Sequence, residues 1–447
     1  MRKMKQWTIL MLSFLLVFSL AACTSGGTTE GGGSTPSGGE KPKEGGEQPK
    51  AEGKVELSFW TLGSNGYEKL VEEWNKANPN IQVKIQNTGD QTAHHNNLTT
   101  ALSAGSGAPD IFMLEIGFME RFIGAQDKFQ NLNDFGAKDI AKNYLDWKWK
   151  QASSVDGKFQ IGLPTDIGPT VVFYRTDLLE QAGLPTDPEA FAKEIDTWDK
   201  FAAVAKQFKE KTGKPFTDLK DLVYNALRDQ SQDQIYFKKE DNSFIGDQNP
   251  QVKKAYDYTV KGIQEGWIGN WAIWSPEWGQ ATDKGEFAVM LGPAWMTSVI
   301  KGNAKASAGK WRITQLPEGA GNWGGSFLTI PKQGKHPKEA YQFISWMVSK
   351  ENQLKTFQAN GLMPSIPELY TDPAFTGFKD EFYGNQAVAV EFGKSANRVK
   401  PVYYGPLHDQ TDSFIKAGLQ NVMEKKTDPA QEWADAIAKA KKLAERS

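Results

Sequence analysis

Short strand-like and helix-like segments alternate along the chain from residue 55 onward. Residues 55–60 and 81–85 have the apolar patterns of strands, and residues 67–77 between them carry apolar side chains at helical spacing. The order repeats with a helix expected over 98–104 and a strand over 110–114. Strands that alternate with helices form α/β folds with a largely parallel sheet, because each helical crossover returns the chain in the same direction. The alternation therefore predicts an α/β fold.

Length sets the expected number of lobes. The part of the chain from residue 54 to 447 exceeds the size at which single hydrophobic cores stop growing, so two lobes are expected. A strong helix is expected from Thr197 to Lys211, and another from Pro276 to Lys284 with Ser275 as its N-cap. Further helices are expected at 178–182 (capped by Thr176 and Asp177), 255–264, 337–348 and 429–445, and extended segments at 162–174, 287–291 and 326–330.

The first 23 residues have the pattern of a secretory leader. Basic residues precede an apolar run over 9–20 that is too short to span a bilayer. The sequence LAAC that ends at Cys23, the only cysteine, resembles the bacterial lipobox, in which the thiol receives a diacylglyceryl group and becomes the mature N-terminus. The pattern predicts a signal peptide at 1–22 and lipidation of Cys23. The alternative is an ordinary secreted protein with a stray cysteine.

Composition separates the next segment from the body of the protein. After Cys23, residues up to 53 include no aromatic side chain and no aliphatic one larger than alanine, so this segment is expected to be a disordered tether. The formal net charge of the chain is −2 without a basic block, which argues against nucleic acid as a partner. With its one cysteine lipidated, the protein is expected to have no disulfide and no thiolate chemistry.

Tryptophan is unusually frequent, with 15 in the chain. Four of them, between 267 and 278, are spaced by four, three and four residues, which would fit a buried helical stripe. Glycine and proline interrupt any single helix through this segment, and this favours tryptophans on loops at a surface. Indole packs well on the C–H face of a pyranose, while hydroxyls need polar groups at the rim. Two or three of Trp267, Trp271, Trp274, Trp278 and Trp295 are expected to line a sugar site, and the rest to be core.

Several runs, in order along the chain, resemble the extracellular solute-binding lipoproteins that feed sugar importers of the ATP-binding-cassette type, the relatives of maltose-binding protein. The runs are VELSFWTLG and YEKLVEEWNKANPNIQVKI (55–85), LSAGSGAPDIFML (102–114), GLPTDIGPTVVFYRTDLLEQAGL (162–184), KGEFAVMLGPAW (284–295), GGSFLTIPKQGKHPKEAYQFISWMV (324–348) and NGLMP (360–364).

The resemblance implies a two-lobe periplasmic-binding-protein type II fold, with hinge crossings and an interlobe cleft that holds ligand. Its crossings would lie at 166–169, 323–326 and 361–364, each rich in glycine or proline. The N-lobe would comprise 54–165 and 327–361, and the C-lobe 170–322 and 365–447.

Most candidate ligand-binding residues lie at a strand end, at a crossing or in the tryptophan-rich segment, whereas Asn65 and Tyr404 are chosen from their position in the chain only. Trp295 follows Gly292-Pro293, where the resembling family carries an aromatic residue that stacks on sugar, although this chain inserts Ala294. Asp110 is expected to be a structural turn residue. The candidates are Trp60, Asn65, Glu115, Asp166, Trp271, Trp274, Trp278, Trp295, Trp323, Gly324, Met363 and Tyr404.

Other chemistries are weaker. A surface glycoside hydrolase would use similar aromatic subsites with a carboxylate pair, but no acidic motif, Gly-x-Ser-x-Gly elbow, His-Glu-x-x-His or P-loop is present. His94 and His95 are adjacent, so their side chains diverge, and the four histidines are expected to be solvated rather than metal ligands. A non-sugar solute-binding lipoprotein and an adhesive lectin remain alternatives.

The sequence thus predicts a binding protein without enzymatic activity, cofactor or metal. We expect a monomer, lipid-anchored at the extracellular face of a bacterial membrane, that captures a sugar, most simply an oligosaccharide, by closure of two lobes. The resemblance implies delivery to two membrane permease subunits with a cytoplasmic ATPase.

Overall fold

The computed structural model describes residues 53–63 and 65–446. The chain divides into two units, Met1–Ala51 and Glu52–Ser447, and all described residues belong to the second unit. The predicted signal peptide, Cys23 and all but the last residue of the predicted tether lie outside the described residues. Within the part that is described, no helix combines the length and the apolar character needed to cross a membrane.

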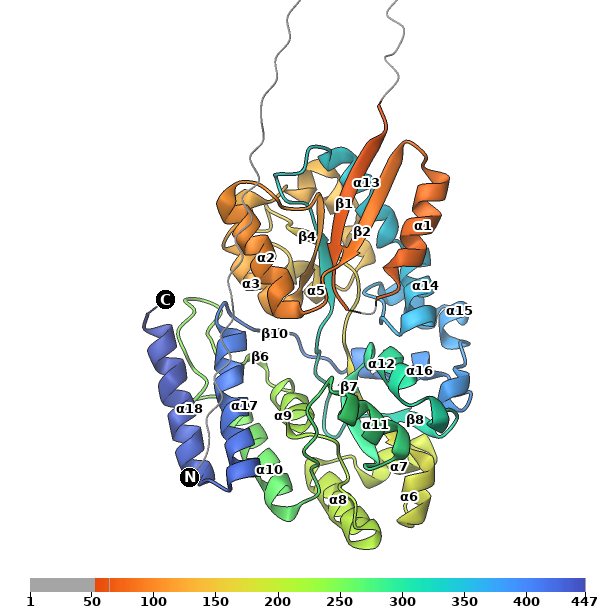
Figure 1. The fold of residues 1–447 in the computed structure, drawn as a ribbon, viewed down its shortest axis with the longest axis vertical. Helices are drawn as coiled ribbons and strands as arrows, with labels where there is room; N and C mark the ends of the chain where they lie inside the picture. The colour runs from red at the N-terminus through yellow and green to blue at the C-terminus, as the bar shows by residue number, and fades with distance from the viewer. Residues whose placement is uncertain (1–52, 64, 447) are drawn as a thin grey trace, which may run out of the picture. The chain divides into compact units, whose positions relative to one another are not determined.

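The first sheet has five strands in the order β2 (Ile81–Asn87), β1 (Val55–Thr61), β3 (Ile111–Glu115), β9 (Ser326–Thr329) and β4 (Gly162–Pro164). β2, β1 and β3 are parallel, whereas β9 runs antiparallel to both β3 and β4. The sheet is therefore mixed, and the prediction of a largely parallel sheet is wrong here, because β9 runs against both of its neighbours. Figure 1 shows α1 (Tyr67–Ala77), α2 (Gln91–Ala104) and α13 (Pro337–Met347) packed around it.

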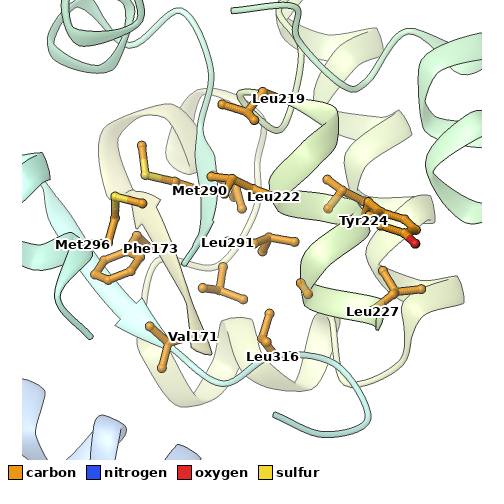
Figure 2. Close-up of a cluster of buried hydrophobic side chains, with 14 of the residues drawn as sticks. Val171, Phe173, Leu219, Leu222, Tyr224, Leu227, Met290, Leu291, Met296 and Leu316 are labelled. Atoms are coloured by element: carbon orange, nitrogen blue, oxygen red, sulfur yellow. The ribbon is translucent and has the colours of Figure 1, made fainter. Parts of the chain in front are cut away.

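The second sheet is antiparallel throughout, with β5 (Thr170–Arg175) between β7 (Val289–Pro293) and β8 (Trp311–Thr314). All six residues of β5 are buried, as expected for the central strand of a covered sheet. α9 (Lys220–Arg228) packs against β7, and Figure 2 shows side chains from α9, β5 and β7 gathered in one apolar cluster. A third, two-stranded parallel pairing joins β6 (Asp233–Gln234) to β10 (Val402–Tyr403).

The other helices surround these sheets. They are α3 (Met119–Ile123), α4 (Ala137–Ile140), α5 (Asp146–Gln151), α6 (Thr176–Gln181), α7 (Pro188–Glu194), α8 (Trp198–Thr212), α10 (Pro250–Glu265), α11 (Pro276–Lys284), α12 (Met296–Asn303), α14 (Lys350–Asn360), α15 (Pro373–Thr376), α16 (Val388–Ala396), α17 (His408–Lys425) and α18 (Pro429–Ala444). Short 3-10 helices lie at η1 (Ile116–Phe118), η2 (Gln126–Lys128), η3 (Leu132–Phe135), η4 (Ala141–Asn143), η5 (Lys305–Ser307), η6 (Pro367–Thr371) and η7 (Glu381–Tyr383).

Local sequence signals account for several boundaries. Thr197 caps α8 by accepting a hydrogen bond from the backbone N–H of Lys200, and Ser275 does the same for α11 through Trp278. The expected cap of α6 by Thr176 and Asp177 is wrong, since both residues lie inside that helix and Arg175 holds the Asp177 carboxylate instead. These two side chains form an ion pair, which removes the carboxylate from a capping role.

The two sheets are joined by segments that lie side by side. The backbone N–H of Ile167 donates to the carbonyl of Met363 over 2.8 Å, and the N–H of Trp323 donates to the carbonyl of Gly168 over 2.8 Å. Gly168 has no room for a side chain, because a Cβ atom there would lie 1.8 Å from the Trp323 carbonyl oxygen. The chain between β4 and β5 therefore runs in close backbone contact with the segment before β9. The lobe boundaries given above stay predictions.

A buried charge network lies beside the second sheet, at the end of α9 and the start of α17. It consists of Arg228, Asp229, Asp412, Lys416 and Tyr236. Arg228 forms ion pairs with Asp229 (2.7 Å) and with Asp412, and Tyr236 donates its hydroxyl to Asp412 over 2.7 Å. Burial alone would raise the pKa of Asp412, but Arg228 and Lys416 hold it well below its usual value. The carboxylate is thus ionised and paired inside the protein.

Candidate functional site

Four tryptophans from three separate segments form one aromatic group, called here the tryptophan cluster: Trp274, Trp278, Trp295 and Trp323. The rings of Trp274 and Trp295 stack with centroids 6.1 Å apart and planes inclined by 29°. Trp278 meets Trp274 edge-on at 5.6 Å, and Trp323 meets Trp295 edge-on at 5.0 Å. Residues about 50 positions apart in the sequence are thereby brought together next to the crossing segments.

Trp295 is the central member of the cluster. It follows β7 and directly precedes α12, is half-buried, and packs against both large clusters of buried apolar side chains. Its indole N–H donates to the backbone carbonyl of Trp323 over 3.0 Å. Gly324 permits this approach, since a Cβ atom there would lie 2.7 Å from the indole nitrogen. The ring is therefore oriented by a hydrogen bond to the crossing itself.

Trp267 and Trp278, which lie in the same sequence segment as Trp274, are core residues. Trp267 is fully buried and donates its indole N–H to Glu265, and Trp278 is 1% exposed and donates to Asp218 Oδ2 over 2.9 Å. Trp271 is half-buried against Phe287, with its ring over Gly269. The structure thus divides the segment between core and surface. Trp278 is the buried member of the tryptophan cluster, so its ring cannot contact a ligand directly in this conformation.

Trp274 is the exposed member of the cluster, with 55% of its surface accessible. Its backbone adopts a φ of 69°, in the left-handed region that bulky side chains rarely occupy. The next residue, Ser275, is the N-cap of α11.

A carboxylate of the first sheet approaches one from α17. Glu115 ends β3, and its Oε2 accepts hydrogen bonds from the backbone N–H of Gly117 (2.6 Å) and from Gln91 (3.1 Å). A Cβ atom on Gly117 would lie 2.9 Å from Glu115 Oε2 and 3.4 Å from Asp409 Oδ1, so both oxygens border the same small space. Burial, and next the negative charge of Asp409, raise the pKa of Glu115 to about 8. Glu115 is therefore largely protonated at neutral pH.

This pKa makes a testable prediction for the variant Glu115→Gln. The pKa of Glu115 is about 8 in the folded protein and near 4.5 in the unfolded chain, so the folded protein binds this proton more tightly. Glu115 therefore disfavours folding increasingly as pH rises from about 4.5 to about 8. We expect the unfolding free energy of the wild type to fall, relative to that of the variant, across this window. Urea unfolding at several pH values measures the difference, and parallel pH profiles for the two proteins would contradict the prediction.

Lys148 is a residue of this region that sequence reasoning missed. It is fully buried, its ammonium lies 3.9 Å from the centroid of the Phe327 ring, and its Nζ has no hydrogen-bond partner among the described residues. Burial lowers the pKa of Lys148 to about 7, although Asp166 and Glu115 act in the opposite direction. Trp147 and Trp149 flank Lys148 in the sequence, and these two apolar neighbours are the sequence feature that indicates burial of helix α5.

Asp166 lies at the first crossing, where it is held by its surroundings. Its Oδ1 accepts hydrogen bonds from the Thr165 hydroxyl (2.6 Å) and from the backbone N–H of Ser326 (3.0 Å), and so links two crossing segments. Burial raises the pKa of Asp166, while Lys148 opposes the shift. The carboxylate is 4% exposed and acts in this conformation as a structural connection.

The remaining candidates are more enclosed than the sequence suggested. Asn65 is 3% exposed and its amide donates to Thr61 and to the Leu62 carbonyl, so it shapes the turn before α1. Met363 is fully buried, and the buried Tyr404 donates its hydroxyl to the Asn322 carbonyl over 2.8 Å. Trp60 is half-buried at the end of β1. The group that the structure brings together is thus the tryptophan cluster with Gly324, near the crossing that holds Asp166.

The expectation of solvated histidines is wrong for His94, His95 and His408, which are buried. His94 and His95 are fully buried on α2, because β3 and η1 cover both faces of the helix that these side chains occupy. His94 stacks on Phe112 at 4.1 Å and His95 on Phe118 at 3.8 Å. Burial lowers their pKa values to about 4 and about 3. Among the described residues no group of three or more metal-binding side chains occurs.

Two open hollows lie away from the tryptophan cluster. One of about 350 Å³ is lined in part by Glu189, Thr314 and Arg398, and one of about 450 Å³ in part by Gln230, Glu318 and Arg398. Neither lining includes an aromatic side chain, so neither offers a stacking surface for a ring-shaped ligand. The tryptophan cluster remains the candidate with the required chemistry.

Two α/β lobes joined by crossing segments, with aromatic side chains beside the crossings, define a class of two-lobe ligand-capturing proteins. The model of the family described as bacterial extracellular solute-binding protein matches residues 61–354. The chain belongs to this family.

Relatives agree with that assignment. The arabinooligosaccharide-binding protein of Halalkalibacterium halodurans is 26% identical over 414 residues, covering 88% of this chain and 90% of that protein. The lactose-binding protein of Rhizobium radiobacter is 28% identical, covering 76% of this chain and 80% of that protein. A crystal structure of an extracellular solute-binding protein of family 1 matches with a TM-score of 0.79 and 34% identity, covering 87% of this chain and all of that one.

The fold alone is shared more widely. The galacto-N-biose-/lacto-N-biose I-binding protein of the ABC transporter from Bifidobacterium longum, solved with lacto-N-biose, matches with a TM-score of 0.73 at 21% identity, covering 89% of this chain and 98% of that one. The two-lobe fold predicted from sequence is thereby confirmed.

Proposed function

We propose that this protein is the substrate-binding component of an ABC-type importer and captures an oligosaccharide on Trp295 of the tryptophan cluster. The single observation that carries the proposal is the position of Trp295. Its half-buried indole is hydrogen-bonded to a crossing segment, next to an exposed second indole. The relatives named for arabinooligosaccharide and lactose binding support a sugar as the ligand.

The proposed mechanism is closure of the two lobes around the sugar. A ligand shifts such an equilibrium only through contacts that differ between the open and closed states. Stacking of the sugar on Trp295 would supply such a contact. The Trp295 ring packs against both large apolar clusters, so a change in their relative position would move it. The predicted crossings at 166–169, 323–326 and 361–364 would absorb the backbone rotation.

The first experiment is a calorimetric titration of residues 54–447 with a panel of neutral oligosaccharides that includes arabinotriose and lactose. Saturable binding with intact sugar is the expected result. X-ray scattering of the same samples should show contraction when sugar saturates the protein. Absence of binding across the panel would direct the search to other solutes, and absence of contraction would contradict lobe closure.

The main rival is a surface glycoside hydrolase, and one observation keeps it under test. Glu115, with its raised pKa, borders the same space as Asp409, and a protonated carboxyl beside an ionised one is the arrangement that glycosidases use. We propose binding without turnover, because the family comprises binding proteins. Chromatography of the titrated sugars after prolonged incubation decides the matter. Cleavage that disappears in Glu115→Gln would replace the binding assignment with a hydrolase.

We further propose that the protein acts as a monomer on the extracellular side, anchored by lipid on Cys23 and separated from the membrane by residues 24–53. A permease pair with a cytoplasmic ATPase would receive the sugar. Two acyl chains give stable membrane attachment. Mass spectrometry of the mature N-terminal peptide is expected to show a diacylglyceryl group on Cys23. An unmodified thiol, or a mature terminus elsewhere, would overturn the anchor.

A further inference from the structure

The stacked pair Trp274 and Trp295 is too close to hold a sugar between its rings. Carbon atoms in van der Waals contact are about 3.5–4.0 Å apart, so two indoles that sandwich a pyranose need a separation of about 7–8 Å or more. The observed centroid distance is 6.1 Å. Trp274 is also the more exposed ring of the pair, at 55%. Trp274 therefore lies between solvent and the part of the Trp295 ring that it contacts.

The backbone under Trp274 is strained. The N–H of Ser275 donates to the carbonyl of Ala272 over 3.1 Å, which closes a turn with Trp274 as its third residue. A positive φ at this position is normally supplied by glycine or asparagine, yet here a tryptophan has a φ of 69°. Such strain persists only where the surroundings stabilise it, and at functional sites it often accompanies a two-state element. The stabilising contacts here are the rings of Trp295 and Trp278.

We propose that Trp274, in this conformation, covers part of the sugar-stacking face of Trp295 and is displaced when a sugar ring binds there. The inference rests on the proposed function and adds a gate to the same site. If the binding face is open in only a fraction of the molecules, the apparent Kd equals the intrinsic Kd divided by that fraction. Removal of the cover therefore strengthens binding, whereas removal of a stacking platform would weaken it.

Two variants separate the ring from the backbone. Trp274→Gly removes the indole and suits the positive φ, so the turn and the N-cap of α11 are retained. Trp274→Phe keeps an aromatic cover and is the matched control. Calorimetry with arabinotriose, lactose and the other sugars of the panel is expected to show about fivefold or tighter binding to Trp274→Gly. Binding to Trp274→Phe should stay within about twofold of the wild type. Weaker or unchanged binding to Trp274→Gly would overturn the proposal.

A second readout does not need a sugar. Acrylamide quenching of Trp295, obtained as the difference between proteins with and without Trp295→Phe, is expected to increase in the Trp274→Gly background. Unchanged quenching would show that Trp274 is no cover, whatever the sugar data. If quenching increases but no oligosaccharide binds the wild type or Trp274→Gly, the cover stands as a feature of the fold, whereas the proposed function and the displacement by sugar both fail.

Discussion

Replacing Arg228 with methionine is expected to lower the free energy of unfolding by about 3–5 kcal/mol. The guanidinium is 3% exposed and is the cation shared by Asp229 and Asp412 in the buried charge network. Methionine would leave the buried Asp229 carboxylate without its cation, and Asp412 with Lys416 as its remaining cation. The penalty comes from the remaining charges more than from the lost attraction, because a buried ion without a counterion has neither water nor a partner.

Urea unfolding monitored by circular dichroism measures this loss. Arg121→Met is the matched control, since Arg121 is exposed and is expected to change stability by less than about 0.5 kcal/mol. The wild-type network also sets a pH dependence. The pKa of Asp412 is held below its usual value in the folded protein. The contribution of Asp412 to the free energy of unfolding is therefore fully present above the pKa of the unfolded chain, about 4, and is lost as pH falls. A loss under about 1 kcal/mol in Arg228→Met would show that the network is solvated or dispensable.

Replacing Trp295 with alanine is expected to weaken oligosaccharide binding by about 2–4 kcal/mol, which is roughly 30- to 1,000-fold in Kd. The ring is the central member of the tryptophan cluster, and its loss removes both the stacking surface and the contact that orients Trp323. Large effects of this kind are typical of half-buried aromatic side chains at the centre of a binding site.

Calorimetry with the sugar identified in the panel measures the change. Trp433→Ala serves as control, because Trp433 on α18 packs against Tyr256 with the ring planes inclined by 51°, and Figure 1 shows α18 well away from α11 and α12. Trp295→Phe should retain part of the affinity. Unchanged affinity in Trp295→Ala would remove Trp295 from the site and leave the location of the sugar open.

Much of the fold followed from local signals. The bounds of α1 and α11 match the predicted helices, because each has a strong start or stop beside an apolar face. α2 begins at Gln91, earlier than predicted, since its first turn is polar and its start is marked by the cap Asp90 instead of apolar spacing. The predicted extended run 162–174 is divided between two sheets, as β4 and β5. The chain bends at residues whose contacts lie more than a hundred positions away, which no local pattern records.

The candidate site was less accessible to sequence reasoning. Tryptophan-rich loops indicated the right segment, but which rings meet depends on tertiary packing, as the pairing of Trp274 with Trp295 shows. Asp110 was correctly interpreted as structural, since its carboxylate accepts hydrogen bonds from the backbone and hydroxyl of Ser58. The burial of Lys148 and the approach of Asp409 to Glu115 could not be predicted, because charged residues on helices are ordinarily exposed.

The backbone of Trp323 has hydrogen-bond partners on both sides of its Cα atom. Its N–H donates to the Gly168 carbonyl, and its carbonyl accepts the indole N–H of Trp295. Any rotation of the strands at this point changes the direction of that carbonyl and therefore tilts the indole that it holds. In the proposed closure, the lobe angle and the orientation of the Trp295 ring would therefore change together, and a spectroscopic probe of Trp295 is expected to report that angle.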